Sequence, residues 1–160
     1  MRKQKGFSLI ELLIVVAIIL IIAAIAIPNL LRSRMAANEA SAVGSIRTIN
    51  TSQVTFASTY GIGFADTLIH LGSPATGTCT ASATSACLLD GVLSASQKSG
   101  YTFTLTATAG TTTSPNNVYS LWGEPVARGS SGQSGFYSDE SGVIRKNPTA
   151  TAAPASSPLQ

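Results

Sequence analysis

An apolar run near the N-terminus constrains the fold of this chain more than any other feature. The run extends over 21 residues from Phe7 to Ile27. An α-helix of this length, rising about 1.5 Å per residue, measures about 31 Å, which matches the hydrocarbon core of a bilayer at about 30 Å. Its single ionised side chain is Glu11, and a carboxylate costs about 2.5–3.5 kcal/mol at the bilayer centre and less near the interface. We therefore predict a membrane-spanning helix over 7–27 in which Glu11 acquires a compensating partner.

The residues on either side of the run follow a defined order. Residues 6–11 read GFSLIE, and Pro28 closes the run. Three basic residues stand before it: Arg2, Lys3 and Lys5. From Met1 to about Leu31 this order resembles the class III signal of type IV pilins and of the related type II secretion pseudopilins. One difference is Leu20, where many members of the family have a glycine that is thought to help the helix loosen in the filament.

The resemblance implies processing followed by assembly. A prepilin peptidase would cut between Gly6 and Phe7 and methylate the new amino group of Phe7. The mature subunit would join identical or homologous pilin subunits in a helical filament, built by an inner-membrane assembly platform and its ATPase. Glu11 would then approach the Phe7 ammonium of a neighbouring subunit, or only complement its own helix N-terminus. The implied location is a bacterial inner membrane, with the N-terminus cytoplasmic and the head outside, and later a pilus or a periplasmic filament.

Two other kinds of segment share part of this pattern. A secretory signal peptide has an apolar region of about 7–15 residues and an A-x-A cleavage site. Residues 24–26 would supply that site, but the apolar run here is longer and contains Glu11. An ordinary single-pass anchor keeps its basic flank in the cytoplasm and needs neither Gly6 nor Glu11.

The net charge of the chain comes from its first residues. The 160 residues carry Lys+Arg 10 and Asp+Glu 7, a formal net charge of +3. Three of the basic residues precede Gly6, so the remainder is balanced at 10 − 3 = 7 against 7, and no basic patch for nucleic acid is evident. The sequence contains no phosphate-binding glycine loop, zinc-ligand spacing or nucleophile elbow, and its single histidine, His70, is interpreted as structural. We expect neither an enzyme nor a cofactor.

The predicted fold is α+β and pilin-like, with one long N-terminal helix packed on a small antiparallel sheet of three to four strands. Short helical turns are expected at 65–71 or 88–93. The predicted segments are a leader peptide over 1–6, a transmembrane helix over 7–27, an amphipathic continuation over 28–60, a variable connecting region over 61–100, the sheet over 101–147 and a disordered tail over 148–160.

The helix is expected to continue beyond Pro28 with a kink, because proline removes one backbone hydrogen bond. Apolar residues then recur on one face at 100° per residue, a spacing typical of an amphipathic helix. Gly61 and Gly63 should end this helix. The apolar stripe comprises Leu31, Met35, Ala42, Ile46, Ile49, Phe56 and Tyr60, and the polar Asn38 and Gln53 also fall on it.

Alternation of apolar and polar residues predicts the strands. Over 101–108 every second side chain is apolar and should face the core. The other predicted strands are 118–122, which Gly123, Glu124 and Pro125 should end, and 135–138 and 143–145, which flank a tight turn at 139–142.

Two cysteines, Cys79 and Cys87, enclose a short segment of small residues. Outside the cytoplasm, oxidising conditions permit a disulfide between them, which would stabilise the fold by about 2–3 kcal/mol in the chain-entropy model. The alternatives are a reduced pair or half of a metal site, for which further ligands are lacking. Asp139 and Glu140 are weak candidates for calcium, which prefers 6–8 oxygen ligands, so no metal site is expected.

The tail from Pro148 onward is rich in Thr, Ala, Ser and Pro, a composition typical of disorder. Ser156 and Ser157 are candidates for O-linked sugar. Taken together, these features predict a prepilin, the structural subunit of a type IV pilus or related filament. The alternatives are a pseudopilin of a type II protein secretion system and, from another class, a membrane-anchored extracytoplasmic binding module whose sheet or cysteine loop contacts a surface.

Overall fold

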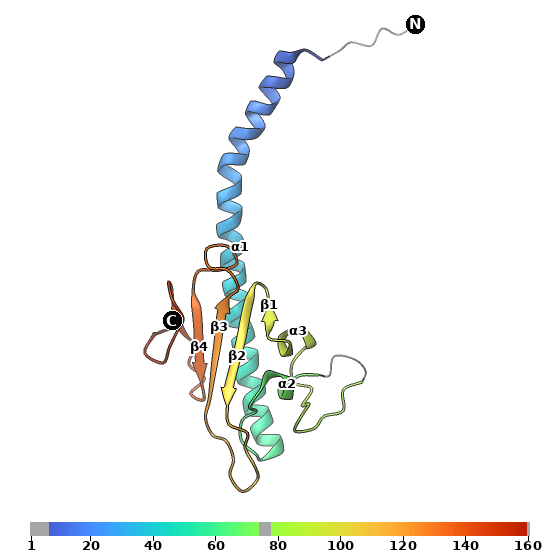
Figure 1. Ribbon diagram of the computed structural model, residues 1–160, viewed down its shortest axis with the longest axis vertical. Helices are drawn as coiled ribbons and strands as arrows, with labels where there is room; N and C mark the ends of the chain where they lie inside the picture. Colours follow the sequence, from blue (N-terminus) through green and yellow to red (C-terminus); the bar gives the residue numbers. More distant parts are fainter. Residues whose placement is uncertain (1–6, 74–77, 160) are drawn as a thin grey trace. The chain divides into compact units, whose positions relative to one another are not determined.

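The computed structural model describes residues 7–73 and 78–159. The chain divides into two compact units between Arg34 and Met35, and helix α1 contributes to both. The described helices are α1 (Leu9–Tyr60), α2 (Leu68–Leu71) and α3 (Gly91–Ser94). The described strands form one antiparallel sheet in chain order (Figure 1): β1 (Gln97–Lys98), β2 (Tyr101–Ala107), β3 (Tyr119–Pro125), β4 (Gly135–Asp139), β5 (Arg145–Asn147) and β6 (Ser157–Pro158). A long helix with a small antiparallel sheet confirms the predicted fold class.

In the first unit, the stretch of α1 from Leu12 to Ile27 is apolar on all sides, and its large apolar side chains are exposed. The large apolar side chains from Leu9 to Leu31 are between 45% and 76% exposed. Pro28 lies inside α1, and the helix continues on both sides of it. The kink at Pro28 stays a prediction. A surface of this kind requires lipid or other helices around it.

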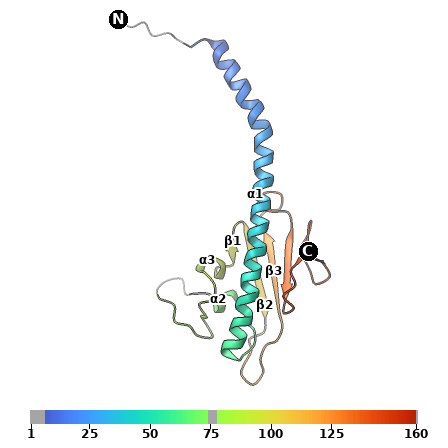
Figure 2. The ribbon, with the colours of Figure 1, turned by 180° about the vertical axis from the view of Figure 1, so that it is seen from behind.

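In the second unit, the part of α1 from Met35 to Tyr60 lies along one face of the sheet (Figures 1 and 2). Its buried apolar residues join those of the strands in a single core. The helix contributes Ala42, Ile46, Ile49 and Phe56, and the strands contribute Tyr101, Phe103, Tyr119, Leu121 and Phe136. These positions confirm the apolar stripe between Ala42 and Phe56, whereas Leu31, predicted on the same stripe, lies in the first unit and is exposed.

Polar residues on the stripe bind the backbone of the loops that cross it. Gln53 is fully buried, and its side-chain amide exchanges two hydrogen bonds with the backbone of Ala65, of 3.0 Å and 2.8 Å. Asn38 Nδ2 donates to the carbonyl of Ser131 at 2.7 Å. Because buried polar groups need such partners, these two side chains fix loops to the helix without opening the core.

Glu39 joins α1 to the loop before β4 and to β5. Its Oε1 accepts hydrogen bonds from the backbone N–H groups of Gln133 at 3.0 Å and Ser134 at 3.1 Å. Its Oε2 accepts from Ser134 Oγ and from Lys146 Nζ, each at 3.2 Å. Burial alone would raise the pKa of Glu39, but these hydrogen bonds and the Lys146 charge outweigh it and lower the pKa below its ordinary value.

The end of α1 follows the predicted glycine signal. The helix ends at Tyr60, and Gly61 adopts φ +67°, a left-handed conformation that favours glycine. The Gly61 N–H donates to the Ala57 carbonyl at 3.1 Å, which satisfies one of the last carbonyls of the helix. Further along, α2 lies within the predicted turn at 65–71, and α3 begins later than predicted because Asp90 caps it by accepting from the Leu93 N–H at 2.7 Å.

The second long strand, β3, extends beyond its predicted end. Gly123, Glu124 and Pro125 were expected to end it at residue 122, yet they belong to β3 and pair with β2. A Cβ added at Gly123 would lie 3.2 Å from Cδ1 of Ile46 and 3.3 Å from Cε1 of Phe103. The glycine therefore leaves room for core side chains to reach the strand, a role distinct from that of a strand breaker.

The sheet also differs from prediction at its ends. Three to four strands over 101–147 were expected, and four of the described strands, β2 to β5, lie there. Two further strands of two residues each, too short to show alternation, extend the described sheet at both edges. The segment 148–159 was expected to be disordered, yet β6 lies within it and pairs with β5. Ala152 is buried, and the Leu159 N–H donates to the Ile144 carbonyl at 2.8 Å. Backbone pairing and one small buried side chain order this segment despite its polar composition.

Candidate functional site

The first residues of α1 form a helix cap around Glu11. The helix begins at Leu9, so Ser8 occupies the N-cap position and Glu11 the third helical position. The backbone N–H of Ser8 donates to Glu11 Oε2 at 2.8 Å, and the Leu12 N–H donates to the Ser8 carbonyl at 3.3 Å. This is the glutamate half of a capping box, in which the side chain at the third position reaches back to the N-cap N–H. The carboxylate therefore has a partner within its own chain.

Sequence reasoning treated Glu11 as a charge and missed the role of Ser8. The signal was present, because a serine followed three residues later by a glutamate and then an apolar run is the usual mark of a capping box. Phe7, next to the cap, is 84% exposed. Gly6, the other half of the predicted cleavage site, lies outside the described residues.

The helix that follows the cap meets the length and composition of a membrane span. Its most apolar window of 18 residues has a mean hydropathy of 3.3, and none of that window is buried within the chain. Leu20 stands at the position where many members of the resembled family have a glycine. It lies within α1 and is 63% exposed. Glu11 thus lies in the first turn of an uncovered apolar helix, where its carboxylate accepts the Ser8 N–H.

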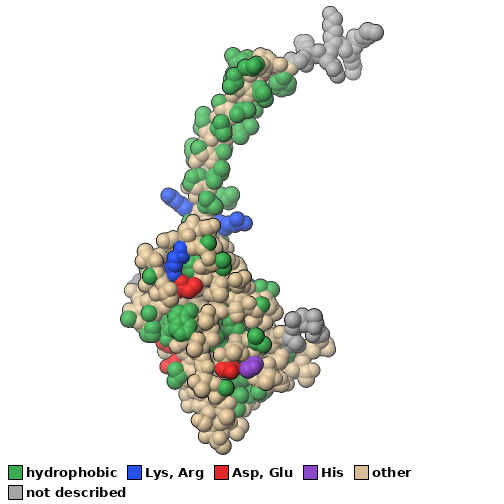
Figure 3. All heavy atoms as spheres, in the orientation of Figure 1, with side chains coloured by type: hydrophobic (Ala, Val, Ile, Leu, Met, Phe, Trp, Pro, Cys, Tyr) green, Lys and Arg blue, Asp and Glu red, His purple; other side chains and the backbone are tan. Residues whose placement is uncertain are grey.

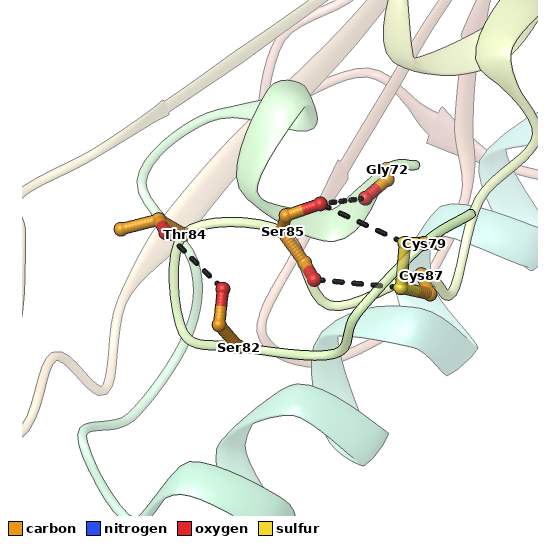
Figure 4. Close-up of a disulfide and its surroundings, with 6 residues drawn as sticks. All are labelled: Gly72, Cys79, Ser82, Thr84, Ser85 and Cys87. Atoms are coloured by element: carbon orange, nitrogen blue, oxygen red, sulfur yellow. Dashed lines mark hydrogen bonds between the residues drawn. A yellow bond between two sulfur atoms is a disulfide. The ribbon is translucent and has the colours of Figure 1, made fainter. Parts of the chain in front are cut away.

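The predicted disulfide is confirmed and joins Cys79 to Cys87 (Figure 4). The Cα atoms of Cys79 and Cys87 are 6.0 Å apart, within the usual range for a disulfide. Ser85 Oγ contacts Cys79 Sγ at 3.7 Å and donates to the Gly72 carbonyl at 3.2 Å, and the Cys87 N–H donates to the same carbonyl at 3.2 Å. The disulfide loop, residues 79–87, is therefore tied to the residue that follows α2.

The two acidic residues considered for calcium belong to a tight turn. Asp139 Oδ1 accepts from the Ser141 N–H at 3.0 Å, and the Asp139 carbonyl accepts from the Gly142 N–H at 2.9 Å. Glu140 is exposed beside it. Over residues 7–73 and 78–159, no group of three or more His, Cys, Asp or Glu side chains is close enough to hold a metal ion. These hydrogen bonds hold Asp139 in the turn.

His70 also has a partner within the fold. Its Nδ1 lies 2.5 Å from Oδ1 of Asp66, one helical turn earlier in the chain, and the His70 carbonyl accepts from the Ala86 N–H at 2.7 Å. Both side chains are partly exposed. The first contact holds the imidazole against the segment before α2, and the second joins the backbone of α2 to the disulfide loop, in agreement with the structural role predicted for this histidine.

A capped, uncovered apolar helix and an α+β unit with a disulfide loop form a pilin-like arrangement. The prokaryotic N-terminal methylation motif matches residues 1–27. The type IV wide pilus major component PilA4 of Thermus thermophilus is 67% identical over 39 residues, which cover 24% of this chain and 30% of the relative. The type IV major pilin protein PilA of Myxococcus xanthus is 45% identical over 54 residues, which cover 34% of this chain and 24% of the relative.

These matches confirm the resemblance to type IV pilins that the first residues indicate. They fall in the N-terminal region, where the methylation motif, the cap and the apolar helix lie. Each match spans less than a third of the relative's own length.

Proposed function

We propose that this protein is a prepilin, the structural subunit of a type IV pilus or a related filament. The observation that carries the proposal is the uncovered apolar helix with Glu11 in its first turn, which lies within the matched N-terminal methylation motif. The names of both relatives describe pilus components, which supports a pilus subunit over a secretion pseudopilin. A filament would cover the apolar helix with the same helix of neighbouring subunits.

Processing would prepare the helix for that assembly. A prepilin peptidase cuts between Gly6 and Phe7 and methylates the new amine, and the subunit waits in the inner membrane with its second unit outside. An assembly platform and its ATPase then move it into the filament. Lipid tails are as apolar as leucine, so the hydrophobic effect does not favour moving the helix from the membrane into the filament. Helix packing and polar pairing must therefore drive this step.

Glu11 and the Phe7 ammonium of a neighbouring subunit would supply the polar pairing. Two unit charges about 4 Å apart attract by about 4 kcal/mol at an effective dielectric of about 20, before desolvation. A methylated amine keeps its positive charge at neutral pH, so methylation does not remove the pair.

The proposal is tested on filaments sheared from cells that express the chain with its native assembly proteins. Intact mass and N-terminal sequencing should identify a chain that begins at N-methylated Phe7 and contains the Cys79–Cys87 disulfide. A surface-exposed chain that begins at Met1, or one cut after Ala26 as in a secretory signal peptide, would contradict the proposal.

A further inference from the structure

Two arginines stand where the apolar length of α1 ends. Arg32 and Arg34 are exposed and are the last charged residues of the first compact unit. Figure 3 shows Lys and Arg side chains projecting to both sides of the helix at this level. Among the described residues, neither guanidinium lies within 4.0 Å of a carboxylate. Nothing in the described fold accounts for either charge.

The distance from these arginines to Glu11 matches the thickness of a bilayer. Between Glu11 and Arg32 the helix contains 20 residues, Leu12–Leu31, without an ionisable side chain. At about 1.5 Å per residue, the two charged positions are separated by about 32 Å along the helix axis. The hydrocarbon core is about 30 Å thick, so both charges fall at its boundaries when Leu12–Leu31 spans it.

The two arginines are also placed to reach headgroups around the helix. Residues two apart are rotated by about 200°, so Arg32 and Arg34 project from opposite sides, with Arg34 about 3 Å further along the axis. Guanidinium groups bind phosphate through paired hydrogen bonds, and long basic side chains extend readily toward an interface. The charge, the spacing and the uncovered apolar run all fit one partner, the phosphate of a phospholipid.

We propose that the unassembled subunit sits in the membrane between Glu11 at the inner boundary and Arg32 at the outer boundary, where Arg32 and Arg34 bind phospholipid phosphates of the outer leaflet. The inference rests on the membrane-anchored stage of the proposed function. It moves the centre of the span from Ala17, the midpoint of 7–27, to the junction of Ile21 and Ile22. It also places the Glu11 carboxylate at an interface, where its insertion cost is small.

The first test measures the depth of the helix. Single cysteines replace Ile14, Ala17, Ile21 and Ile25 in the full chain, and each is labelled with a nitroxide in vesicles of phosphatidylethanolamine and phosphatidylglycerol. Cys79 and Cys87 are joined in a disulfide, so the label goes to the introduced thiol. The ratio of oxygen to nickel-chelate accessibility should peak at residue 21, about 6 Å along the axis from the alternative centre at residue 17. A peak at residue 17 would overturn the proposal.

The second test detects the phosphate contact itself. Carbon-13 is placed at Cζ of all arginines, and dephasing by phosphorus-31 is recorded by solid-state NMR in the same vesicles, in phosphate-free buffer. Every sample carries Arg2→Lys, which keeps the leader charge but removes its guanidinium. The parent should show dephasing, the double variant Arg32→Gln with Arg34→Gln should lose more than half of it, and Arg47→Gln in the second unit should retain it. No dephasing in the parent, or no loss in the double variant, would overturn the proposal.

Alkaline carbonate extraction separates failure of this inference from failure of the proposed function on which it rests. A chain that carbonate releases from the membrane is not anchored, and both the inference and the proposed prepilin function fail. A chain that stays in the membrane pellet but shows its centre at residue 17 leaves the proposed function intact and removes only the lipid-binding role of the arginines.

Discussion

The backbone N–H of Ser8 donates a 2.8 Å hydrogen bond to Oε2 of Glu11. This bond separates two roles of one side chain, because capping needs only a hydrogen-bond acceptor while pairing with an ammonium needs a negative charge. Glutamine keeps the acceptor and loses the charge, and it is the other residue used at this position of a capping box. The two roles of Glu11 can therefore be tested independently.

Removing the charge of Glu39 should destabilise the second unit. Glu39→Gln weakens the bonds from Gln133 and Ser134 and leaves the Lys146 ammonium without its ion-pair partner. We expect a loss of about 1–3 kcal/mol in the free energy of unfolding, measured by urea denaturation in detergent through Trp122 fluorescence. Glu140→Gln, at an exposed turn position, is the matched control and should change it by less than about 0.5 kcal/mol. Equal effects of the two substitutions would contradict a stabilising role for the hydrogen bonds of Glu39.

The lowered pKa of Glu39 predicts how the free energy of unfolding depends on pH. The pKa of Glu39 is lower in the folded chain than its ordinary value of 4.5, so its contribution is fully present above that value. It is lost as the pH falls through the lowered folded pKa. Urea denaturation at a series of pH values from 7 downward should therefore show the difference between wild type and Glu39→Gln shrinking below pH 4.5. A difference that stays constant to strongly acidic pH would show that the charge of Glu39 is not its source.

A larger residue at Gly123 should disturb the core. Gly123→Val places a branched side chain where a Cβ alone already approaches Ile46 Cδ1 at 3.2 Å, and overpacking of this kind costs about 1–3 kcal/mol. Adding Ile46→Val should recover part of the loss, because it removes the methyl that clashes. Gly44→Ala on α1, with no atom within 4 Å of its added Cβ, should instead stabilise by about 0.5–1 kcal/mol. Additive effects of Gly123→Val and Ile46→Val in denaturation experiments would contradict the close contact.

Opening the disulfide should loosen its loop while the core remains folded. For Cys79→Ser with Cys87→Ser, the chain-entropy model gives a loss of about 2–3 kcal/mol for a loop of this size. Amide hydrogen exchange should increase at residues 79–87 and change little at the centre of β3. Unchanged exchange in the loop would mean that the bonds to Gly72 hold it without the disulfide.

Periodic burial made much of the fold predictable from sequence. The stripe from Ala42 to Phe56 and the alternation in β2 are repeated signals, because a helix or strand that covers a core must place apolar residues at its own period. The methylation motif and Glu11 were also evident, since their order is local. What these elements share is that each residue's role depends on its neighbours in the chain.

Roles that depend on distant contacts could not be predicted in this way. Gly123 was interpreted as a strand breaker because its purpose, space for Ile46, lies across the core. The two-residue strand β6 gives no alternation, and its order comes from backbone pairing with β5. The cap at Ser8 is different, because the spacing of Ser8 and Glu11 is a local signal that the sequence contains. The prediction considered only the charge of Glu11 and did not include its hydrogen bond to Ser8.

The central claim, that the charge of Glu11 pairs with the Phe7 ammonium of a neighbouring subunit, is tested by comparing Glu11→Gln with Glu11→Ala. The glutamine variant keeps the cap on Ser8, so insertion and cleavage after Gly6 should remain close to wild type. The alanine variant loses the cap as well as the charge. Equal membrane pools of each subunit are established first by immunoblotting, so that assembly is compared at the same supply.

The deciding measurement is the amount of filament recovered by shearing and counted by electron microscopy. We expect at least a tenfold reduction for Glu11→Gln, because an attraction of about 4 kcal/mol exceeds the 1.4 kcal/mol that corresponds to a factor of ten. Glu11→Ala should assemble no better. Wild-type amounts of filament from Glu11→Gln, together with a defect in Glu11→Ala, would show that Glu11 serves only as a helix cap and would contradict the account.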